Sequence, residues 1–142
     1  MTAINRPDVH AEVMACVMLY ERALTTNDVD LLDELFWPSP HTIRYGPGEV
    51  LYGHAEILAF RQQRDARNLA RKIRRLEITT FGEDFATANL EFQRAGDQRI
   101  GRQSQAWVRF APGWRVVSAH VSLMAESTLA TTASERHHGE PD

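Results

Sequence analysis

The chain has 142 residues, of which 43% are hydrophobic and 25% charged, and its formal net charge is −3. These values are typical of one globular domain, and they exclude an overall basic field that would hold nucleic acid or an anionic membrane. No apolar run approaches the roughly 18 residues that span a bilayer, and the single cysteine, Cys16, cannot form an internal disulfide. We therefore expect a soluble cytoplasmic protein without a targeting segment.

Helical spacing of apolar residues predicts three helices in the first half of the chain. The first begins at Pro7-Asp8, has its apolar face between Val9 and Leu24, and stops at Thr25-Thr26-Asn27. Asn27 or Asp28 can cap a second helix over Val29–Leu35, which the following prolines end. A third helical pattern follows Gly53.

Period-two patterns predict strands in the remaining segments. A brief hairpin joins Thr42–Tyr45 to Val50–Tyr52 through a glycine-rich turn. Four long strands follow, with short turns that favour an antiparallel meander: Ile73–Phe81, Phe85–Arg94, Ile100–Phe110 and Trp114–Met124. The fold class is therefore α+β, with three helices on a curved, mainly antiparallel sheet that encloses a pocket. We expect residues 1–125 to form this single domain and residues 126–142 a polar, flexible tail.

Polar residues alternate along the last two predicted strands. Strict alternation places Gln103, Gln105 and Trp107 on one face of the first strand. It places Trp114, Ser118, His120 and Ser122 together on one face of the second. Such rows either face water or line a cavity whose contents must be hydrogen-bonded.

Tyr20 and Arg44 are the first candidates for chemistry. Tyr20 lies on the apolar face of the first helix, where it is either a core tyrosine bonded to a backbone carbonyl or a proton donor in the pocket. Arg44 could clamp a carboxylate through two parallel hydrogen bonds. If Ile43 faces inward, however, alternation turns Arg44 outward, so the pattern leaves its direction open.

Two further titratable residues have competing interpretations. Glu91 belongs to a polar row on the second long strand that is a solvated surface, a dimer contact or a ligand-binding wall. His120 is either a structural histidine or a pocket residue. The adjacent His137 and His138 lack fixed geometry, so we predict no metal site.

A run of basic residues between the third helix and the first long strand superficially resembles a nucleic-acid stripe. Aromatic residues do not alternate with these charges, and the net charge of the chain is acidic. We interpret the run as a solvated helix end and strand edge. It comprises Arg61, Arg64, Arg67, Arg71, Lys72, Arg74 and Arg75.

The order of elements, with Trp114-Arg115-Val116-Val117 leading to His120-Val121-Ser122, resembles the superfamily of cone-shaped domains named for nuclear transport factor 2, whose polyketide cyclase-like members are called SnoaL-like. Longer segments resemble the small family encoded beside amidases in oxalurate and cyanuric acid catabolism, which is typified by the decarboxylating amidohydrolase of 1,3-dicarboxyurea. One departure is Ala106, where a threonine is expected. The matching segments are Tyr20-Glu21-Arg22-Ala23-Leu24, Asn27-Asp28-Val29, Leu32-Asp33-Glu34-Leu35-Phe36-Trp37, Arg44-Tyr45-Gly46, Asp84-Phe85-Ala86-Thr87-Ala88-Asn89 and Gly101-Arg102-Gln103-Ser104-Gln105-Ala106-Trp107.

This resemblance implies that Tyr20 and Arg44 are the catalytic pair. It implies an amidohydrolase that removes a carboxyl group from an N-carboxylated urea, for example converting 1,3-dicarboxyurea to allophanate, without a cofactor or metal. It also implies a homodimer or higher homo-oligomer and a functional link to an amidase. The substrate-binding residues that we expect around this pair are Gln103, Gln105, Trp107, Glu91 and His120.

Two other functions remain open at the level of sequence. One is a non-catalytic ligand-binding or accessory protein that serves a neighbouring amidase. The other is an isomerase or dehydratase of the wider superfamily, which needs a carboxylate base in the pocket. Glu91 is the candidate for that base.

Overall fold

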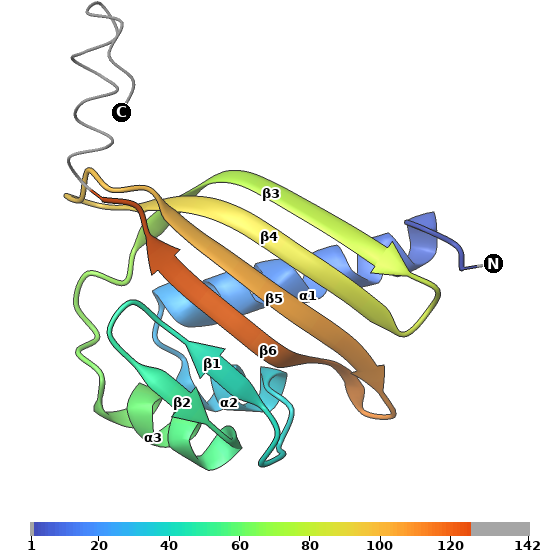
Figure 1. Ribbon diagram of the computed structural model, residues 1–142, viewed down its shortest axis with the longest axis horizontal. Coiled ribbons are helices and arrows are strands. Elements are labelled where there is room, and N and C mark those ends of the chain that lie inside the picture. Colours follow the sequence, from blue (N-terminus) through green and yellow to red (C-terminus); the bar gives the residue numbers. More distant parts are fainter. Residues whose placement is uncertain (1, 126–142) are drawn as a thin grey trace, which may run out of the picture.

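The computed structural model describes residues 2–125. Three helices and six strands follow one another in the predicted order, and Figure 1 shows them as a curved sheet with the helices on one side. The predicted α+β class is confirmed. Within this described part of the chain, no helix combines the length and apolar character needed to cross a membrane. The predicted tail, including His137 and His138, lies outside the described residues.

The helices follow the local signals of the sequence. Helix α1 (Pro7–Thr25) begins at a proline, which is favoured in the first helical turn because its missing N–H would be unpaired there. Its apolar face, which includes Val13, Val17 and Tyr20, is buried. Helix α2 (Val29–Leu35) is capped by the Asp28 carboxylate, which accepts a hydrogen bond of 3.2 Å from the Leu31 amide. Helix α3 spans His54–Gln63.

All six strands form one sheet in the order β2-β1-β6-β5-β4-β3. The long strands are antiparallel neighbours, as the meander predicts, whereas β1 lies parallel to β6. This parallel pair brings the segment that carries Arg44 beside the end of the chain's last strand. The strands are β1 (Ile43–Tyr45), β2 (Val50–Tyr52), β3 (Arg71–Phe81), β4 (Phe85–Arg94), β5 (Gly101–Phe110) and β6 (Gly113–Leu123).

An irregularity in the β5–β6 ladder corrects one expectation from alternation. Trp107 pairs with Val116, but the preceding Ala106 pairs with Ser118, so the ladder skips Val117. A bulge of this kind moves all later side chains to the other face of the strand. Trp114 is therefore buried while Ser118 and His120 are exposed, and the predicted shared face was wrong.

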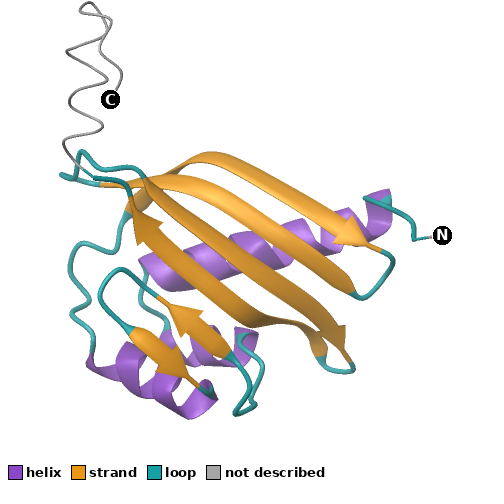
Figure 2. Ribbon diagram, in the orientation of Figure 1, coloured by secondary structure: helices purple, strands orange, loops and turns teal. Residues whose placement is uncertain are grey.

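The hydrophobic core fills the space between α1, α2 and the concave face of the sheet (Figure 2). Its largest members are fully buried, and they hold the helices against the middle of the long strands. At the other end of the same concave face, arginines replace apolar residues. The core members that make this contact include Val13, Val17, Leu32, Phe36, Trp107 and Val116.

Candidate active site

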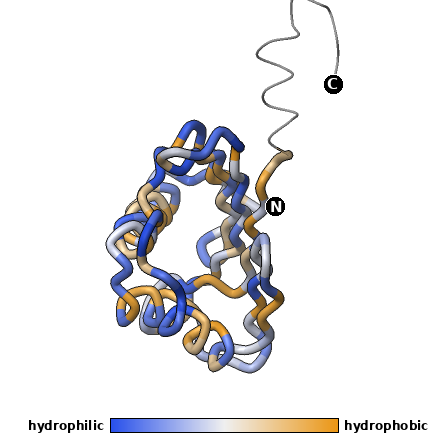
Figure 3. The backbone as a smooth tube through the Cα atoms, turned by 90° about the vertical axis from the view of Figure 1, so that its left-hand side faces the viewer, coloured by the Kyte–Doolittle hydropathy of each residue, from blue (hydrophilic) through white to orange (hydrophobic). Residues whose placement is uncertain are grey.

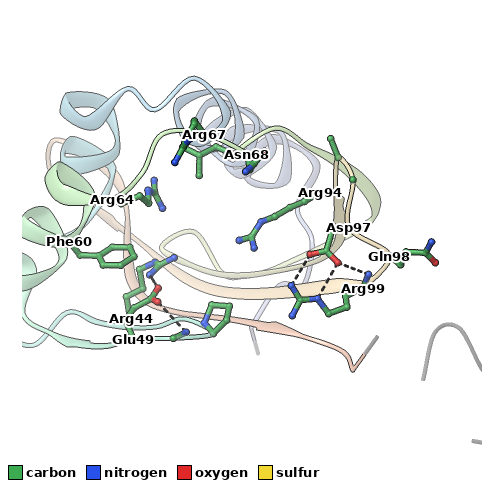
Figure 4. Close-up of a pocket in the computed structure, with 15 residues that line it drawn as sticks. Arg44, Glu49, Phe60, Arg64, Arg67, Asn68, Arg94, Asp97, Gln98 and Arg99 are labelled. Atoms are coloured by element: carbon green, nitrogen blue, oxygen red, sulfur yellow. Dashed lines mark hydrogen bonds and ion pairs between the residues drawn. The ribbon is translucent and has the colours of Figure 1, made fainter. Parts of the chain in front are cut away.

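A cavity of about 710 Å³ opens where α3 and the segment after it face the turn between β1 and β2 and the loop between β4 and β5. Figure 3 views the backbone from this side, where many segments are hydrophilic. Arg44, Arg64 and Arg94 reach toward its interior from three different segments (Figure 4). The cavity is therefore a polar end of the cone and not an extension of the hydrophobic core.

A second, much smaller space of about 20 Å³, which we call the chamber, shares Arg44, Arg64, Leu69 and Arg94 with this cavity. Among the described residues, four arginines and no carboxylate line this chamber. Such a concentration of positive charge in a closed space favours an anionic ligand. The lining residues are Tyr20, Leu24, Arg44, Arg64, Leu69, Arg71, Arg94, Gln103 and Val121.

Tyr20 projects from the buried face of α1 into the chamber, with 2% of its surface exposed. Arg61 of α3 donates a hydrogen bond of 3.3 Å from Nη2 to the Tyr20 hydroxyl oxygen. Burial raises the pKa of the phenol, but the positive charges around it, that of Arg61 first, outweigh burial and lower this pKa to about 8. Tyr20 is consequently a stronger acid than an ordinary tyrosine.

Arg44 reaches the same chamber from β1, although Ile43 precedes it. Arg44 and Thr42 are buried, whereas Ile43 is half-buried, so the premise that Ile43 occupies the inner face was wrong. The Arg44 Nη1 lies 2.6 Å from the Glu49 carboxylate, and its guanidinium carbon lies 5.3 Å from the centre of the Phe60 ring. Its Nε has no hydrogen-bond acceptor among the described residues, so the cation is only partly satisfied.

The interpretation of the basic run as a solvated surface was wrong for several of its members. Arg61 is 1% exposed, and its Nε and Nη1 lack acceptors in the described structure. Arg64 also has two buried nitrogens without acceptors, and burial, followed by the charge of Arg61, lowers the pKa of Arg64 to about 10. A count of surface-type residues cannot distinguish a solvated cation from one that lines a cavity.

Arg71 is the best-paired cation of the chamber. It donates to both carboxylate oxygens of Glu21, at 2.8 Å each, and to the Gln103 side-chain oxygen at 3.0 Å. Its guanidinium also lies 4.2 Å from the centre of the Phe92 ring. Gln103 therefore stands at the chamber as a hydrogen-bonding residue, which is where the sequence placed it.

Gln105 and Trp107 lie deeper, away from the chamber lining. The Trp107 indole nitrogen donates to the Gln105 side-chain oxygen at 3.0 Å, and Trp107 belongs to the hydrophobic core. The amide nitrogen of Gln105 is buried without an acceptor among the described residues. These two residues support the wall of the site from behind and do not line it.

Glu91 and His120 point away from the chamber. Both are exposed on the outer face of the sheet, where His120 packs edge-on against Tyr45 at 5.6 Å between ring centres. The structure thus does not bring these two predicted substrate-binding residues to Tyr20 and Arg44. Within residues 2–125, no three side chains of the metal-binding types are grouped as a metal site.

Comparisons with known proteins place these features in a family context. The family model described as AtzH-like matches residues 2–127. No curated protein matches the chain. A protein of unknown function from Pectobacterium atrosepticum is 54% identical with a TM-score of 0.85, and the match covers 86% of this chain and 95% of that one.

Two further solved structures extend the comparison. A cystatin-like fold protein from Burkholderia xenovorans is 44% identical, with a TM-score of 0.84 and coverage of 88% of this chain and 98% of that one. A nuclear transport factor 2-like superfamily protein from Salmonella enterica is 24% identical, with a TM-score of 0.69 and coverage of 83% and 92%. The nuclear transport factor 2-like, cystatin-like fold implied by the sequence is therefore confirmed.

Proposed function

The chain belongs to the AtzH-like family, and we propose that it is a decarboxylating amidohydrolase that removes a carboxyl group from an N-carboxylated urea. One observation carries this proposal: Tyr20 and four arginines line a chamber without a lining carboxylate, and Arg44, Arg64 and Arg94 also line the adjoining cavity of about 710 Å³, which has room for the substrate. A dicarboxylated urea of the 1,3-dicarboxyurea type supplies the negative charge that such a chamber lacks. The product of this reaction is allophanate.

Arg44 is the binding residue for the carboxylate that remains on the substrate. Loss of carbon dioxide removes negative charge from the departing carboxylate, so a cation on that group would stabilise the ground state more than the transition state. The departing group therefore fits best beside Tyr20, where Leu24 and Val121 contribute apolar wall. Arg64 has two buried N–H groups, at Nε and Nη2, without acceptors among the described residues, and these can bind the remaining negative charge of the substrate.

Tyr20 is the proton donor in this mechanism. As the bond between the carbamate nitrogen and the carboxyl carbon breaks, its electron pair stays on nitrogen and takes the Tyr20 hydroxyl proton. The carbon leaves as carbon dioxide with both carboxylate oxygens. Tyr20 is left as a phenolate, which the surrounding arginines stabilise, and it regains its proton from water.

The placement of Glu91 weighs against the isomerase or dehydratase alternative. Such enzymes need a carboxylate base in the pocket, and Glu91 is exposed on the opposite face of the sheet. An accessory role without catalysis makes a different prediction, because the isolated chain would then bind the carboxylated urea without consuming it.

The first test measures turnover by the isolated chain. Freshly prepared 1,3-dicarboxyurea is followed by carbon-13 NMR, and the spontaneous loss of carbon dioxide is subtracted. We expect the wild type to accelerate formation of allophanate. Tyr20→Phe should lower kcat by about 100-fold, which is the low end for a general acid, whereas Arg44→Met should mainly raise KM.

Lys72→Met is the control, because Lys72 is on β3 but does not line the chamber. It should leave kcat and KM unchanged. Wild-type protein that binds the substrate without exceeding the spontaneous rate would refute catalysis and support the accessory role.

A further inference from the structure

We infer that Arg61 is a positioning residue that aims the Tyr20 hydroxyl proton into the chamber. This inference rests on the proposed function of Tyr20 as proton donor. Arg61 comes from α3 and Tyr20 from α1, and they are joined by the 3.3 Å hydrogen bond from Nη2 to the phenol oxygen. No comparison or family feature described above assigns a role to Arg61.

The direction of this hydrogen bond carries the argument. A guanidinium has N–H donors and no acceptor, so the Tyr20 oxygen must accept from Arg61. The Tyr20 proton therefore cannot be used in that contact, and it is free to point at a ligand in the chamber. A carboxylate or carbonyl partner at the position of Arg61 would have taken this proton instead.

The burial of Arg61 argues against a purely structural role. Its side chain is 1% exposed and forms no ion pair with the described carboxylates. It packs over the rings of Phe36, at 4.8 Å, and Tyr20, at 5.7 Å, and two of its nitrogens lack acceptors. An apolar side chain would fill this space without the cost of desolvating a charge. The buried charge of Arg61 therefore needs a functional explanation. The hydrogen bond from Arg61 to Tyr20 supplies one.

Other charges also face Tyr20, but the described structure gives none of them a hydrogen bond to the phenol. Arg61 is the first contributor among the charges that lower the Tyr20 pKa. Replacing Arg61 with an uncharged residue should therefore reverse a large part of the lowering of the Tyr20 pKa. The other charges should maintain the rest of it. The other facing groups are Arg44 on β1, Arg64 after α3, Arg71 on β3 with its partner Glu21 on α1, and Arg94 on β4.

A titration without substrate tests the role of Arg61 directly. Phenolate absorbance is followed against pH, and the curve of Tyr20→Phe is subtracted to isolate Tyr20. We expect a wild-type pKa of about 8, and in Arg61→Met a rise of more than about one unit toward the ordinary tyrosine value. Arg61→Lys should retain part of the lowering. Arg75→Met, an exposed cation on the outer sheet face, is the matched control and should titrate as the wild type does.

Kinetics with 1,3-dicarboxyurea provide the second readout. Arg61→Met should lower kcat by about 10- to 100-fold while KM changes by less than about threefold, because proton transfer is affected more than carboxylate binding. The alkaline limb of the kcat profile should move to higher pH together with the Tyr20 titration. Arg61→Lys should recover part of the lost kcat.

The outcomes separate this inference from the proposed function. If the Tyr20 titration shifts in Arg61→Met but the wild type shows no turnover, catalysis is refuted and the positioning role stands. If the wild type turns over and Arg61→Met leaves both the titration and kcat unchanged, Arg61 has no such role. Should Arg61→Met fail to fold, Arg61→Gln takes its place, because glutamine removes the charge while it keeps a polar side chain of similar length. A Tyr20 titration and a kcat that are both unchanged in Arg61→Gln would refute the inference.

Discussion

At the scale of single residues, the arginines of the chamber differ in how well they are paired. Arg71 is held by both oxygens of Glu21 and by Gln103, whereas Arg61 and Arg64 keep buried nitrogens without acceptors. A fully paired cation contributes little attraction to a ligand. Arg71 is therefore mainly a structural support, and under the proposed function the ligand-binding charge is that of Arg44, Arg64 and Arg94.

This distinction predicts the effect of breaking the Glu21–Arg71 pair, whose side chains are 11% and 2% exposed. Glu21→Gln leaves a buried guanidinium without its carboxylate and should cost about 3 kcal/mol of the free energy of unfolding. The double variant Glu21→Gln with Arg71→Met removes the unpaired charge and should recover most of that loss. Urea unfolding of the variants measures both effects. Equal stability of the wild type and Glu21→Gln would show that the pair does not hold α1 to β3.

At the scale of elements, the turn between β1 and β2 places a carboxylate on the proposed ligand-binding arginine. Glu49 folds back over Gly46, and any side chain at that glycine would collide with the Glu49 carboxylate. The Glu49 Oε1 is further held by the Gly48 amide at 3.2 Å. The turn thus presents Glu49 to Arg44 as a substitute for a bound carboxylate.

Glu49 should therefore compete with small dicarboxylates for Arg44. We expect Glu49→Gln to lower the Kd of malonate by about tenfold, because the ligand no longer displaces a charge-assisted hydrogen bond. Gly46→Ala should act in the same direction, since it pushes the Glu49 carboxylate away. Isothermal titration calorimetry measures the affinity, with Glu77→Gln on the outer face as control. Weaker malonate binding in Glu49→Gln would instead mean that Glu49 holds Arg44 in its binding position.

Local signals predicted the elements well, because they act within one turn or one strand. The three helices begin where Pro7, Asp28 and Gly53 indicate, and the strand bounds lie within two residues of the prediction. The bulge that skips Val117 was missed, since it depends on the pairing of two strands and leaves no mark in one of them. Its consequence was the wrong face for Trp114.

The inward direction of the chamber arginines was also beyond local patterns. Alternation identifies which residues share a face, but it assigns the inner face by hydrophobicity. Where the inside is a polar chamber, hydrophobicity is no guide, so the direction of Arg44 stayed open. For Arg61 on α3, its charge alone led to the wrong expectation of a solvated side chain. The family resemblance pointed to Tyr20 and Arg44 as a pair, and the structure places both in the lining of one chamber. Their catalytic role stays a prediction.

At the scale of the whole molecule, the two faces of the sheet have different characters. The concave face holds the core and the chamber, while the outer face carries exposed residues of both charges, including Arg75, Glu77 and Glu91. The pairing of two chains through this outer face stays a prediction.

Tyr20 couples the stability of the whole fold to pH. Its pKa is about 8 in the folded chain and close to 10 when unfolded, so between these values the unfolded chain binds more protons and stability rises with pH. The rise is absent below the folded pKa, complete above the unfolded one, and about 2 to 3 kcal/mol in total. The lowered pKa of Arg64, about 10, acts in the same direction at still higher pH. Urea unfolding gives the free energy of unfolding of the wild type and of Tyr20→Phe from about pH 7 to 9.5, and the difference between them is the contribution of the phenol. If the free energies of the two proteins change with pH in parallel, the arginines do not favour the ionised form of Tyr20.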